Sequence, residues 1–241
     1  ALAAYRPRDF GGAVTIRVNS PDLPGSPRTI DFTLELPGRH NLANALLAAG
    51  TALALGVDAD AVAAGLSQYK GIFRRFEVIY QGEFRVIDDA AHNPSNLDAV
   101  FHALAEENPA AVAVVYAIRG SRGVEINRAN AATLARWANR LNLCPLIVTN
   151  CSDTAAPQDR VLPPEEEAFT AALAGLGDQV LFTDTLRQGV RLAIESLEPG
   201  KTLLLLGAHP MDDVSGLFAE LAGVETTVRP RPPHFGQTLD N

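Results

Sequence analysis

The sequence predicts an α/β protein: a Rossmann-like doubly wound sheet, preceded by the end of a smaller α/β domain. Strand and helix patterns alternate five times between residues 71 and 225, which is typical of a parallel sheet covered by helices. The strand expected at 111–117 is apolar at every position, as in a strand buried on both faces. Residues 1–70 are too short and too irregular to form a complete domain by themselves.

The first 70 residues predict two strands followed by two helices. Residues 13–18 and 30–36 alternate apolar and polar side chains, which is the period of half-buried strands. The residues between them, 19–27, are rich in Pro, Gly, Ser and Asn and predict a turn. Helices are expected at 42–55 and at 59–69, the second with Asp58 as its N-cap.

The remaining residues predict the doubly wound sheet. After a strand at 84–87, Asn93-Pro94-Ser95 begins a helix whose buried face we assign to Leu97, Val100, Phe101 and Leu104. Further strands are expected at 111–117, 146–148, 180–182 and 202–206, and further helices at 128–141, 165–174, 186–196 and 214–221. We divide the chain at 1–70, 71–225 and 226–241, the last with Pro230, Pro232 and Pro233 and expected to be an exposed tail.

Composition limits the class of protein. The 241 residues are 47% hydrophobic and carry a formal net charge of −8, which excludes an intrinsically disordered chain and disfavours nucleic acid or an anionic membrane as partners. No apolar run is long enough to span a bilayer and no signal peptide opens the chain, so we expect a cytoplasmic protein. Cys144 and Cys151 are expected to be incidental reduced thiols.

The candidate functional residues follow the predicted strands. Ligands of open α/β sheets bind beyond the carboxyl ends of the strands. There the sequence places Asp88 and Asp89, then Arg119 and Arg122 interleaved with glycines, then His209. The tandem carboxylates could hold a metal, act as a base or accept hydrogen bonds from a ribose, and the arginine loop could contact an anion through side chains and backbone N–H groups. The alternative is that these loops are polar only because they are loops.

A phosphate-binding loop is missing from the sequence. Gly200-Lys201-Thr202 lacks the earlier glycine of that motif, because position 195 is Glu, and it precedes a strand where the motif requires a helix. No other G-x-x-x-x-G-K-[ST] and no G-x-G-x-x-G occurs. The chain therefore has no phosphate cradle of its own.

Three segments in order resemble one family, the Mur ligases with their folylpolyglutamate synthetase relatives. GRHNLANALLAA at 38–49 is similar to the G-x-H-N-x-x-N-A-L-A-A signature, FRRFE at 73–77 to the R-x-E element after the interdomain linker, and DAAHNP at 89–94 to the D-x-A-H-[NT]-P turn. The resemblance covers about residues 30–210. It implies a ligase that joins a carboxylate to an amine with ATP and Mg²⁺ through an acyl phosphate.

Roles for individual residues follow from this resemblance. It implies that residues 1–70 are the end of the central ATP-binding domain and 71–225 the carboxyl-terminal domain. The nucleotide contacts would be Asn44 to adenine, with His40 and Asn41 shaping that pocket, Arg75 to the phosphates and Asp89 to the ribose. The amino-acid substrate would meet a second set, His92, Asn93, Arg119, Ser121, Arg122 and His209. No catalytic residue is assigned, and the metal ligands are expected mostly upstream of Ala1.

Several alternatives stay open from the sequence. The His-Asn-Pro turn favours folylpolyglutamate synthetases, whereas the helix at 38–49 favours the peptidoglycan enzymes. The chain begins with Ala1 and no methionine, so we expect a processed or truncated ligase that is inactive alone and needs its amino-terminal half in cis or in trans. The alternatives are a trimmed initiator methionine, a non-catalytic nucleotide-binding or regulatory module, and a split ligase whose other half is a separate polypeptide.

Overall fold

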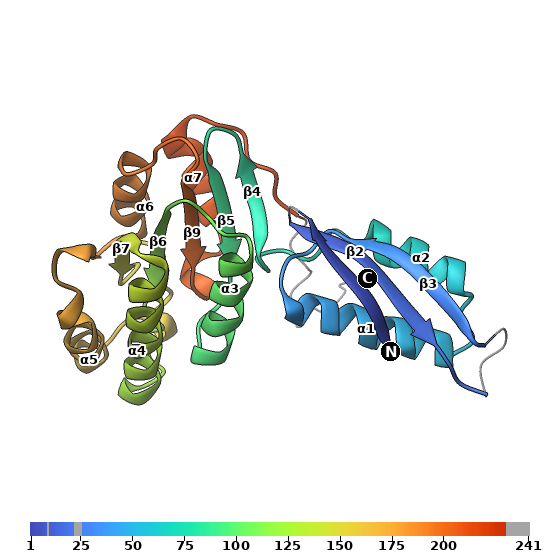
Figure 1. The fold of residues 1–241 in the computed structure, drawn as a ribbon. Helices are drawn as coiled ribbons and strands as arrows, with labels where there is room; N and C mark the ends of the chain where they lie inside the picture. Colours follow the sequence, from blue (N-terminus) through green and yellow to red (C-terminus); the bar gives the residue numbers. More distant parts are fainter. Residues whose placement is uncertain (9, 22–25, 230–241) are drawn as a thin grey trace, which may run out of the picture. The chain divides into compact units, whose positions relative to one another are not determined.

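The computed structural model describes residues 1–8, 10–21 and 26–229 (Figure 1). The chain forms two compact units. The first comprises residues 1–71 and 99–108, and the second comprises 72–98 together with the residues from Pro109 onward. Helix α3 (Pro94–Glu106) contributes to both. No helix in the described part of the chain is long and apolar enough to cross a membrane.

The first unit is a three-stranded antiparallel sheet with two helices packed on it. The strands lie in the order β1 (Leu2–Arg8), β2 (Gly11–Val18), β3 (Arg28–Leu34), and the helices are α1 (Arg39–Ala54) and α2 (Ala59–Gln68). Val14 pairs with Phe32 and Ile16 with Ile30, and all four side chains are buried. The two predicted strands and both helices are confirmed, whereas β1, which contains Pro7, was not predicted. Part of the predicted turn, residues 22–25, lies outside the described residues.

Local sequence explains where the helices of this unit begin. Asp58 is the N-cap of α2, as predicted, and its carboxylate accepts the N–H of Asp60 at 2.8 Å. Helix α1 begins after Gly38, which has a φ of +87°. The side-chain amide of Asn41 donates to the carbonyl of Pro37 at 2.8 Å, so this amide closes the turn that leads into α1.

The second unit is a six-stranded sheet in the order β4-β5-β9-β6-β7-β8. Strand β4 runs antiparallel to β5, and the other five strands are parallel. This confirms the predicted doubly wound, parallel-dominated sheet. The strands are β4 (Glu77–Gln81), β5 (Arg85–Asp89), β6 (Val112–Ala117), β7 (Leu143–Thr149), β8 (Val180–Thr183) and β9 (Thr202–Leu206).

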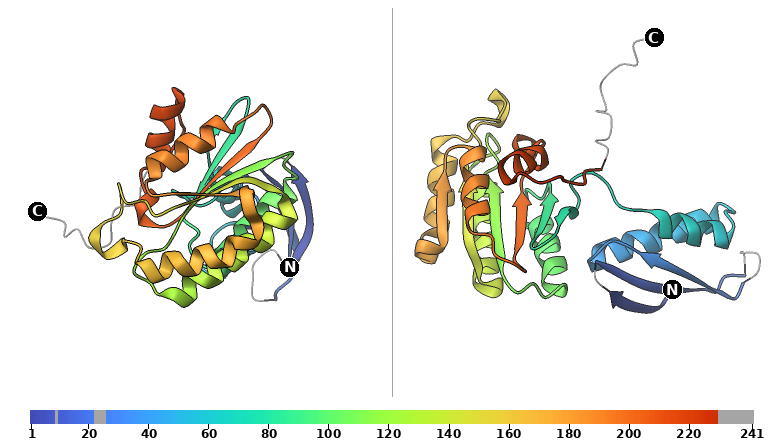
Figure 2. Two further views of the ribbon diagram at one scale, coloured as in Figure 1. Left: turned by 90° about the vertical axis from the view of Figure 1, so that its left-hand side faces the viewer. Right: turned by 90° about the horizontal axis from the view of Figure 1, so that it is seen from above.

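Helices cover both faces of this sheet (Figure 2). Helices α4 (Val124–Leu141) and α5 (Pro163–Leu173) lie on one face, and α6 (Leu186–Glu195) and α7 (Val214–Ala222) on the other. Alternate residues of β6 pack against the helices on opposite faces of the sheet. Val115 belongs to the apolar cluster with Leu186 and Phe218, whereas Tyr116 stacks on Phe169 of α5 with ring centroids 5.5 Å apart. Strands β6 and β9 are buried at every position, as predicted for 111–117.

Some element boundaries differ from the prediction. Helix α4 begins four residues before the predicted start at 128, since Gly123 with a φ of +99° turns the chain into it. Strand β4 was not predicted. Leu97, Val100, Phe101 and Leu104 of α3 are buried as expected.

Residues 226–229, the described part of the predicted tail, lie beside β4. The N–H of Thr227 donates to the carbonyl of Ile79 at 2.8 Å, so residues 226–229 follow this strand. Pro230, Pro232 and Pro233 lie outside the described residues.

This topology places the candidate site. Because β5, β6, β7, β8 and β9 are parallel, their carboxyl ends meet at one edge of the sheet. The loops at that edge are 90–93, 118–123, 150–156, 184–185 and 207–213.

Candidate functional site

Asp89 is the last residue of β5 and organises the turn that follows it. Its carboxylate accepts the N–H of Phe76 at 2.6 Å with one oxygen and the N–H of Ala91 at 2.7 Å with the other. Burial raises its pKa to about 6, against the lowering effect of these hydrogen bonds. A carboxylate has about four lone-pair positions, so Asp89 has a structural role in this chain and still has positions for another donor.

Asp88 faces a different partner. It is buried, and both of its oxygens lie 3.0 Å from Nε of Arg74, which is itself 2% exposed. The two carboxylates of the Asp88-Asp89 pair are therefore separately engaged. Arg74 was not predicted as a site residue, because the sequence of an Arg-Arg pair does not distinguish a buried arginine from an exposed one.

His92 lies in the turn after β5. Its Nδ1 is 2.6 Å from the carbonyl oxygen of Ala90, and since a carbonyl can only accept, Nδ1 carries the proton. Burial lowers the pKa of His92, and the charges of Arg119, Arg75 and His209 lower it further. At pH 7 the imidazole is neutral, so Nε2 has a free lone pair to accept a hydrogen bond.

Two arginines beside His92 are the cations available to a ligand. Arg75 is exposed and Arg119 is partly buried. Neither guanidinium makes a hydrogen bond or ion pair with any residue in the described ranges. Arginine forks bind carboxylate and phosphate groups in a bidentate manner. The structure thus brings Arg75, Arg119 and His209 close enough to act on His92, and the two permanent charges of Arg75 and Arg119 suit an anion.

The rest of the arginine loop is engaged within the protein. The backbone N–H groups of Ser121, Arg122 and Gly123 all donate to the carboxylate of Glu165, at 2.9, 2.8 and 2.6 Å. The Ser121 hydroxyl donates to the carbonyl of Arg160 at 2.8 Å, and Nη2 of Arg122 lies 3.1 Å from Asp159. The idea that these amides contact a ligand anion is therefore wrong for this structure, because Glu165 occupies them.

Asn93 has the local role expected of it. Its side-chain oxygen accepts the N–H of Asn96 at 2.9 Å, which caps the start of α3. The adjacent carbonyl of His92 accepts a hydrogen bond from the amide of Asn130 at 3.1 Å. These two contacts fix the direction in which the His92 ring leaves the turn.

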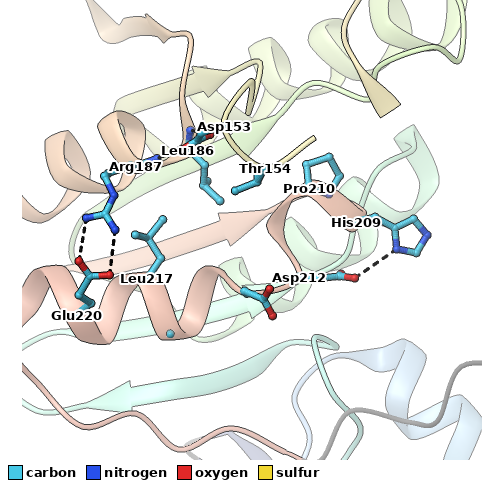
Figure 3. A pocket seen from close by; sticks show the side chains of 11 residues that line it. Asp153, Thr154, Leu186, Arg187, His209, Pro210, Asp212, Leu217 and Glu220 are labelled. Carbon is cyan, nitrogen blue, oxygen red and sulfur yellow. Dashed lines mark hydrogen bonds and ion pairs between the residues drawn. The ribbon is translucent and has the colours of Figure 1, made fainter. Parts of the chain in front are cut away.

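A pocket of about 510 Å³ lies where α6 and α7 meet the carboxyl edge of the sheet (Figure 3). His209 stands at its rim, with Nδ1 3.4 Å from Asp212. Asp153 caps α6 by accepting the N–H groups of Leu186 and Arg187, and Arg187 forms a two-bond ion pair with Glu220. The polar side chains that line this pocket are mostly paired with one another.

The remaining predicted nucleotide residues belong to the first unit. Asn44 and His40 are exposed on α1, and Asn44 borders a hollow lined otherwise by apolar side chains such as Leu47 and Leu55. The amide of Asn41 is engaged with Pro37. The predicted nucleotide contacts are thus divided between the two units.

The described residues do not form a metal site. No three His, Cys, Asp or Glu side chains within 1–8, 10–21 and 26–229 are grouped so that they could hold an ion. Asp88 and Asp89, the candidates from the sequence, are occupied by Arg74 and by backbone N–H groups. The described residues therefore do not fit Mg²⁺.

The sequence matches a known protein family over the greater part of its length. Residues 74–209 match the family described as "Mur ligase, glutamate ligase domain". The chain is 32% identical over 198 residues to the UDP-N-acetylmuramate–L-alanine ligase of Halorhodospira halophila. This alignment covers 79% of the chain and 38% of the relative. It is 34% identical over 187 residues to the UDP-N-acetylmuramyl-tripeptide synthetase of Deinococcus radiodurans. This alignment covers 76% of the chain and 36% of the relative.

Solved structures agree in fold. The UDP-N-acetylmuramate–alanine ligase of Thermotoga maritima superposes with a TM-score of 0.67 at 21% identity, over 91% of this chain and 44% of that protein. The folylpolyglutamate synthase of Mycobacterium tuberculosis gives a TM-score of 0.68 at 20% identity, over 94% of this chain and 48% of that protein. The chain spans less than half the length of each of these four proteins.

Proposed function

Because the chain belongs to the Mur ligase family, we propose that it is the carboxyl-terminal part of an ATP-dependent ligase that joins an acid to an amino acid. The relatives named above as a UDP-N-acetylmuramate–L-alanine ligase and a UDP-N-acetylmuramyl-tripeptide synthetase favour a peptidoglycan precursor as the acid. A folylpolyglutamate-type substrate is the second candidate, supported by the similar fold of a folylpolyglutamate synthase.

The observation that carries this proposal is a pair of arginines beside a neutral histidine, whose guanidinium groups make no hydrogen bond within the described residues. Arg75 and Arg119 act electrostatically on His92 at the carboxyl edge of the sheet, where ligands of such folds bind. An arrangement of two cations and one neutral imidazole suits a substrate with anionic groups and an amine. The arginines can hold phosphate or carboxylate oxygens, and Nε2 of His92 can accept a hydrogen bond from the amine.

Each residue then has a defined role. In the proposed ligase, Arg75 holds the nucleotide phosphates, Asp89 accepts a hydrogen bond from the ribose, and Asn44 contacts adenine. ATP supplies the phosphoryl group that activates the carboxylate as an acyl phosphate. Arg119, His92 and His209 orient the incoming amino acid, while Ser121, Arg122 and Asn93 shape the loops that hold them.

The proposed ligase needs residues that are not among these 241. Residues 1–70 are assigned to the end of the central ATP-binding domain and 71–225 to the carboxyl-terminal domain. The phosphate loop and the Mg²⁺ ligands would come from another segment, in cis or in trans. The 241 residues alone are therefore expected to form no amide. A non-catalytic nucleotide-binding module is the rival function, since it would retain the same cationic loops.

The first experiment is to sequence the coding DNA upstream of the codon for Ala1. An open frame with a G-x-x-G-K-[ST] loop after a strand supports the ligase, whereas a start codon just upstream favours the module or a split ligase. In the longer protein, Arg75→Met should reduce ATP-dependent amide formation at least about tenfold. The control Arg128→Met changes an exposed arginine of α4 that pairs with Glu125 and should leave the rate unchanged. Equal rates for Arg75→Met and the control would overturn the proposal.

A further inference from the structure

Arg74 is a buried residue that links three loops of the candidate site. Its side chain is 2% exposed, and its backbone has a φ of +50°. Phe76, two residues later, is also buried and has a φ of +46°. Left-handed backbone at a bulky residue is uncommon and persists only where the surroundings hold it. These two inward-facing residues leave Arg75, which lies between them, on the surface.

The main chain of Arg74 joins two of these loops. Its N–H donates to the buried carboxylate of Glu77 at 2.8 Å, which closes the turn before β4. Its carbonyl accepts the N–H of Ala90 at 2.9 Å. Asp89, in turn, accepts the N–H of Phe76. The segment that carries Arg75 is thereby pinned on both sides to the turn that carries His92.

The guanidinium of Arg74 extends the link to the third loop, which follows β9. Nη2 donates to the carbonyl of Gly207 at 2.7 Å, and Nη1 donates to the carbonyl of Ala208 at 3.2 Å and to Asp212 at 2.9 Å. Nε pairs with Asp88 of β5. His209 lies between the contacted residues Ala208 and Asp212. One side chain therefore ties the end of β5 to the loop that presents His209.

We propose that Arg74 is the positioning residue of this site: its main chain and its guanidinium together hold Arg75, the His92 turn and the His209 loop in one arrangement. The inference rests on the proposed function only in treating those three groups as ligand contacts. Arginine is required because its planar fork directs five N–H donors in fixed directions. A lysine carries three donors on one nitrogen and cannot reach Asp88, the two carbonyls and Asp212 together.

The test uses Arg74→Lys, which keeps the charge and removes the fork. In the 241-residue chain without nucleotide, hydrogen exchange of the amides in 207–213 and 90–92 should accelerate at least about tenfold. Burial is the largest cause of the lowered pKa of His92, and Arg119, Arg75 and His209 add to it. This pKa, followed by NMR, should rise toward its ordinary value when the loosened loops expose the ring and no longer hold Arg75 and His209 beside it. Arg128→Lys, on the exposed face of α4, should change neither quantity. Unchanged exchange and an unchanged His92 pKa in Arg74→Lys would overturn the inference.

A second variant covers the case in which Arg74→Lys does not fold. Asp212→Ala removes the outer partner of the guanidinium together with the carboxylate beside Nδ1 of His209, and should accelerate exchange in 207–213 while leaving 90–92 protected. Uniform acceleration in both loops, or none in either, would overturn the inference. Calorimetric titration of the longer protein with ATP separates this inference from the proposed function. Absence of ATP binding counts against the function alone, since exchange and the His92 pKa are measured without ligand.

Discussion

The carboxylate of Glu165 accepts the backbone N–H of Gly123 at 2.6 Å, so a residue of α5 closes the amino-terminal end of α4. The same carboxylate accepts the N–H groups of Ser121, Arg122 and Leu162. Successive N–H groups before a helix form an anion-binding concavity. In this protein an internal anion fills that concavity, and the loop that carries Arg119 is held rigid by it.

Glu165→Gln should lower the free energy of unfolding by about 1–3 kcal/mol at pH 7, because an amide cannot accept all four N–H groups and its own NH₂ would face a donor. Burial alone would raise the pKa of Glu165, but the four hydrogen bonds outweigh it and hold the pKa below its ordinary value. The stabilisation is therefore complete above about pH 4.5 and is lost as the pH falls through the lowered pKa.

Urea denaturation at pH 7 and at pH 3 measures this effect. The control is Glu166→Gln, which changes an exposed neighbour on the same turn of α5 and should leave the free energy of unfolding within about 0.5 kcal/mol of the wild type. If the free energies of unfolding of Glu165→Gln and the wild type differed more at pH 3 than at pH 7, the assigned role of the Glu165 carboxylate would be contradicted.

Gly120→Ala should destabilise the second unit by about 1–3 kcal/mol through overpacking. A Cβ at this position would lie 2.2 Å from the carbonyl oxygen of Asp159 and 2.3 Å from the carbonyl carbon of Arg160, so the loop before α5 must move. Gly216→Ala in α7 is the matched control, because nothing lies within 4 Å of its Cβ. Because Gly216 lies in a helix, Gly216→Ala should raise the free energy of unfolding by about 0.5–1 kcal/mol. Thermal or urea unfolding should show a lower free energy of unfolding for Gly120→Ala and a higher one for Gly216→Ala. Changes of the same sign in both variants would count against the close packing at Gly120.

The Asp88-Asp89 pair predicts that stability falls as the pH rises from about 4 to 7. Burial raises the pKa of Asp88 to about 7 and of Asp89 to about 6, both above the ordinary value of 3.8. The native state then holds more protons than the unfolded chain in this range, so each unit of pH reduces the free energy of unfolding. Asp89→Asn should flatten the slope between pH 4 and pH 6 in urea titrations. An equal or steeper slope in the variant would refute the prediction.

The two cysteines should differ in reactivity. Cys151 is buried, and burial raises the pKa of its thiol to about 12, whereas Cys144 is exposed. Because the thiolate is the reactive form, a disulfide reagent should label one thiol per native chain and two in denaturant. Cys144→Ser should abolish the native labelling and retain one thiol in denaturant. Rapid labelling of both cysteines in the native protein would show that Cys151 is accessible.

Regular patterns in the sequence predicted most of the fold. The apolar run at 111–117 became the doubly buried β6, and the spacing of Leu97, Phe101 and Leu104 gave the buried face of α3. Strands β1 and β4 were missed for a physical reason. Both lie at sheet edges. Strand β1 exposes most of its residues, and β4 has only five residues with the polar Glu77 and Gln81 at its ends, so neither shows the apolar periodicity that marks an interior strand.

The site was predicted less completely, because burial of a charge depends on tertiary contacts. Glu165 follows two prolines in a run of three glutamates, a pattern typical of an exposed first helical turn, yet it is 1% exposed. Arg74 and Arg75 are identical neighbours with opposite environments. The positions of Asp89, His92 and Arg119 at strand ends could be predicted, but the hydrogen-bond partners of Asp89 and His92 lie up to 38 residues away and carry no local signal.

The place of β9 has a consequence for synthesis. Strand β9 lies between β5 and β6 and pairs with both. A nascent chain that ends before Thr202 can form the β4–β5 hairpin and the β6-β7-β8 layer, but among the described strands only β9 pairs with both parts. Apolar side chains at the centre of the sheet stay exposed until β9 has been synthesised. A chain that lacks β9 would therefore be prone to aggregate rather than form a smaller domain.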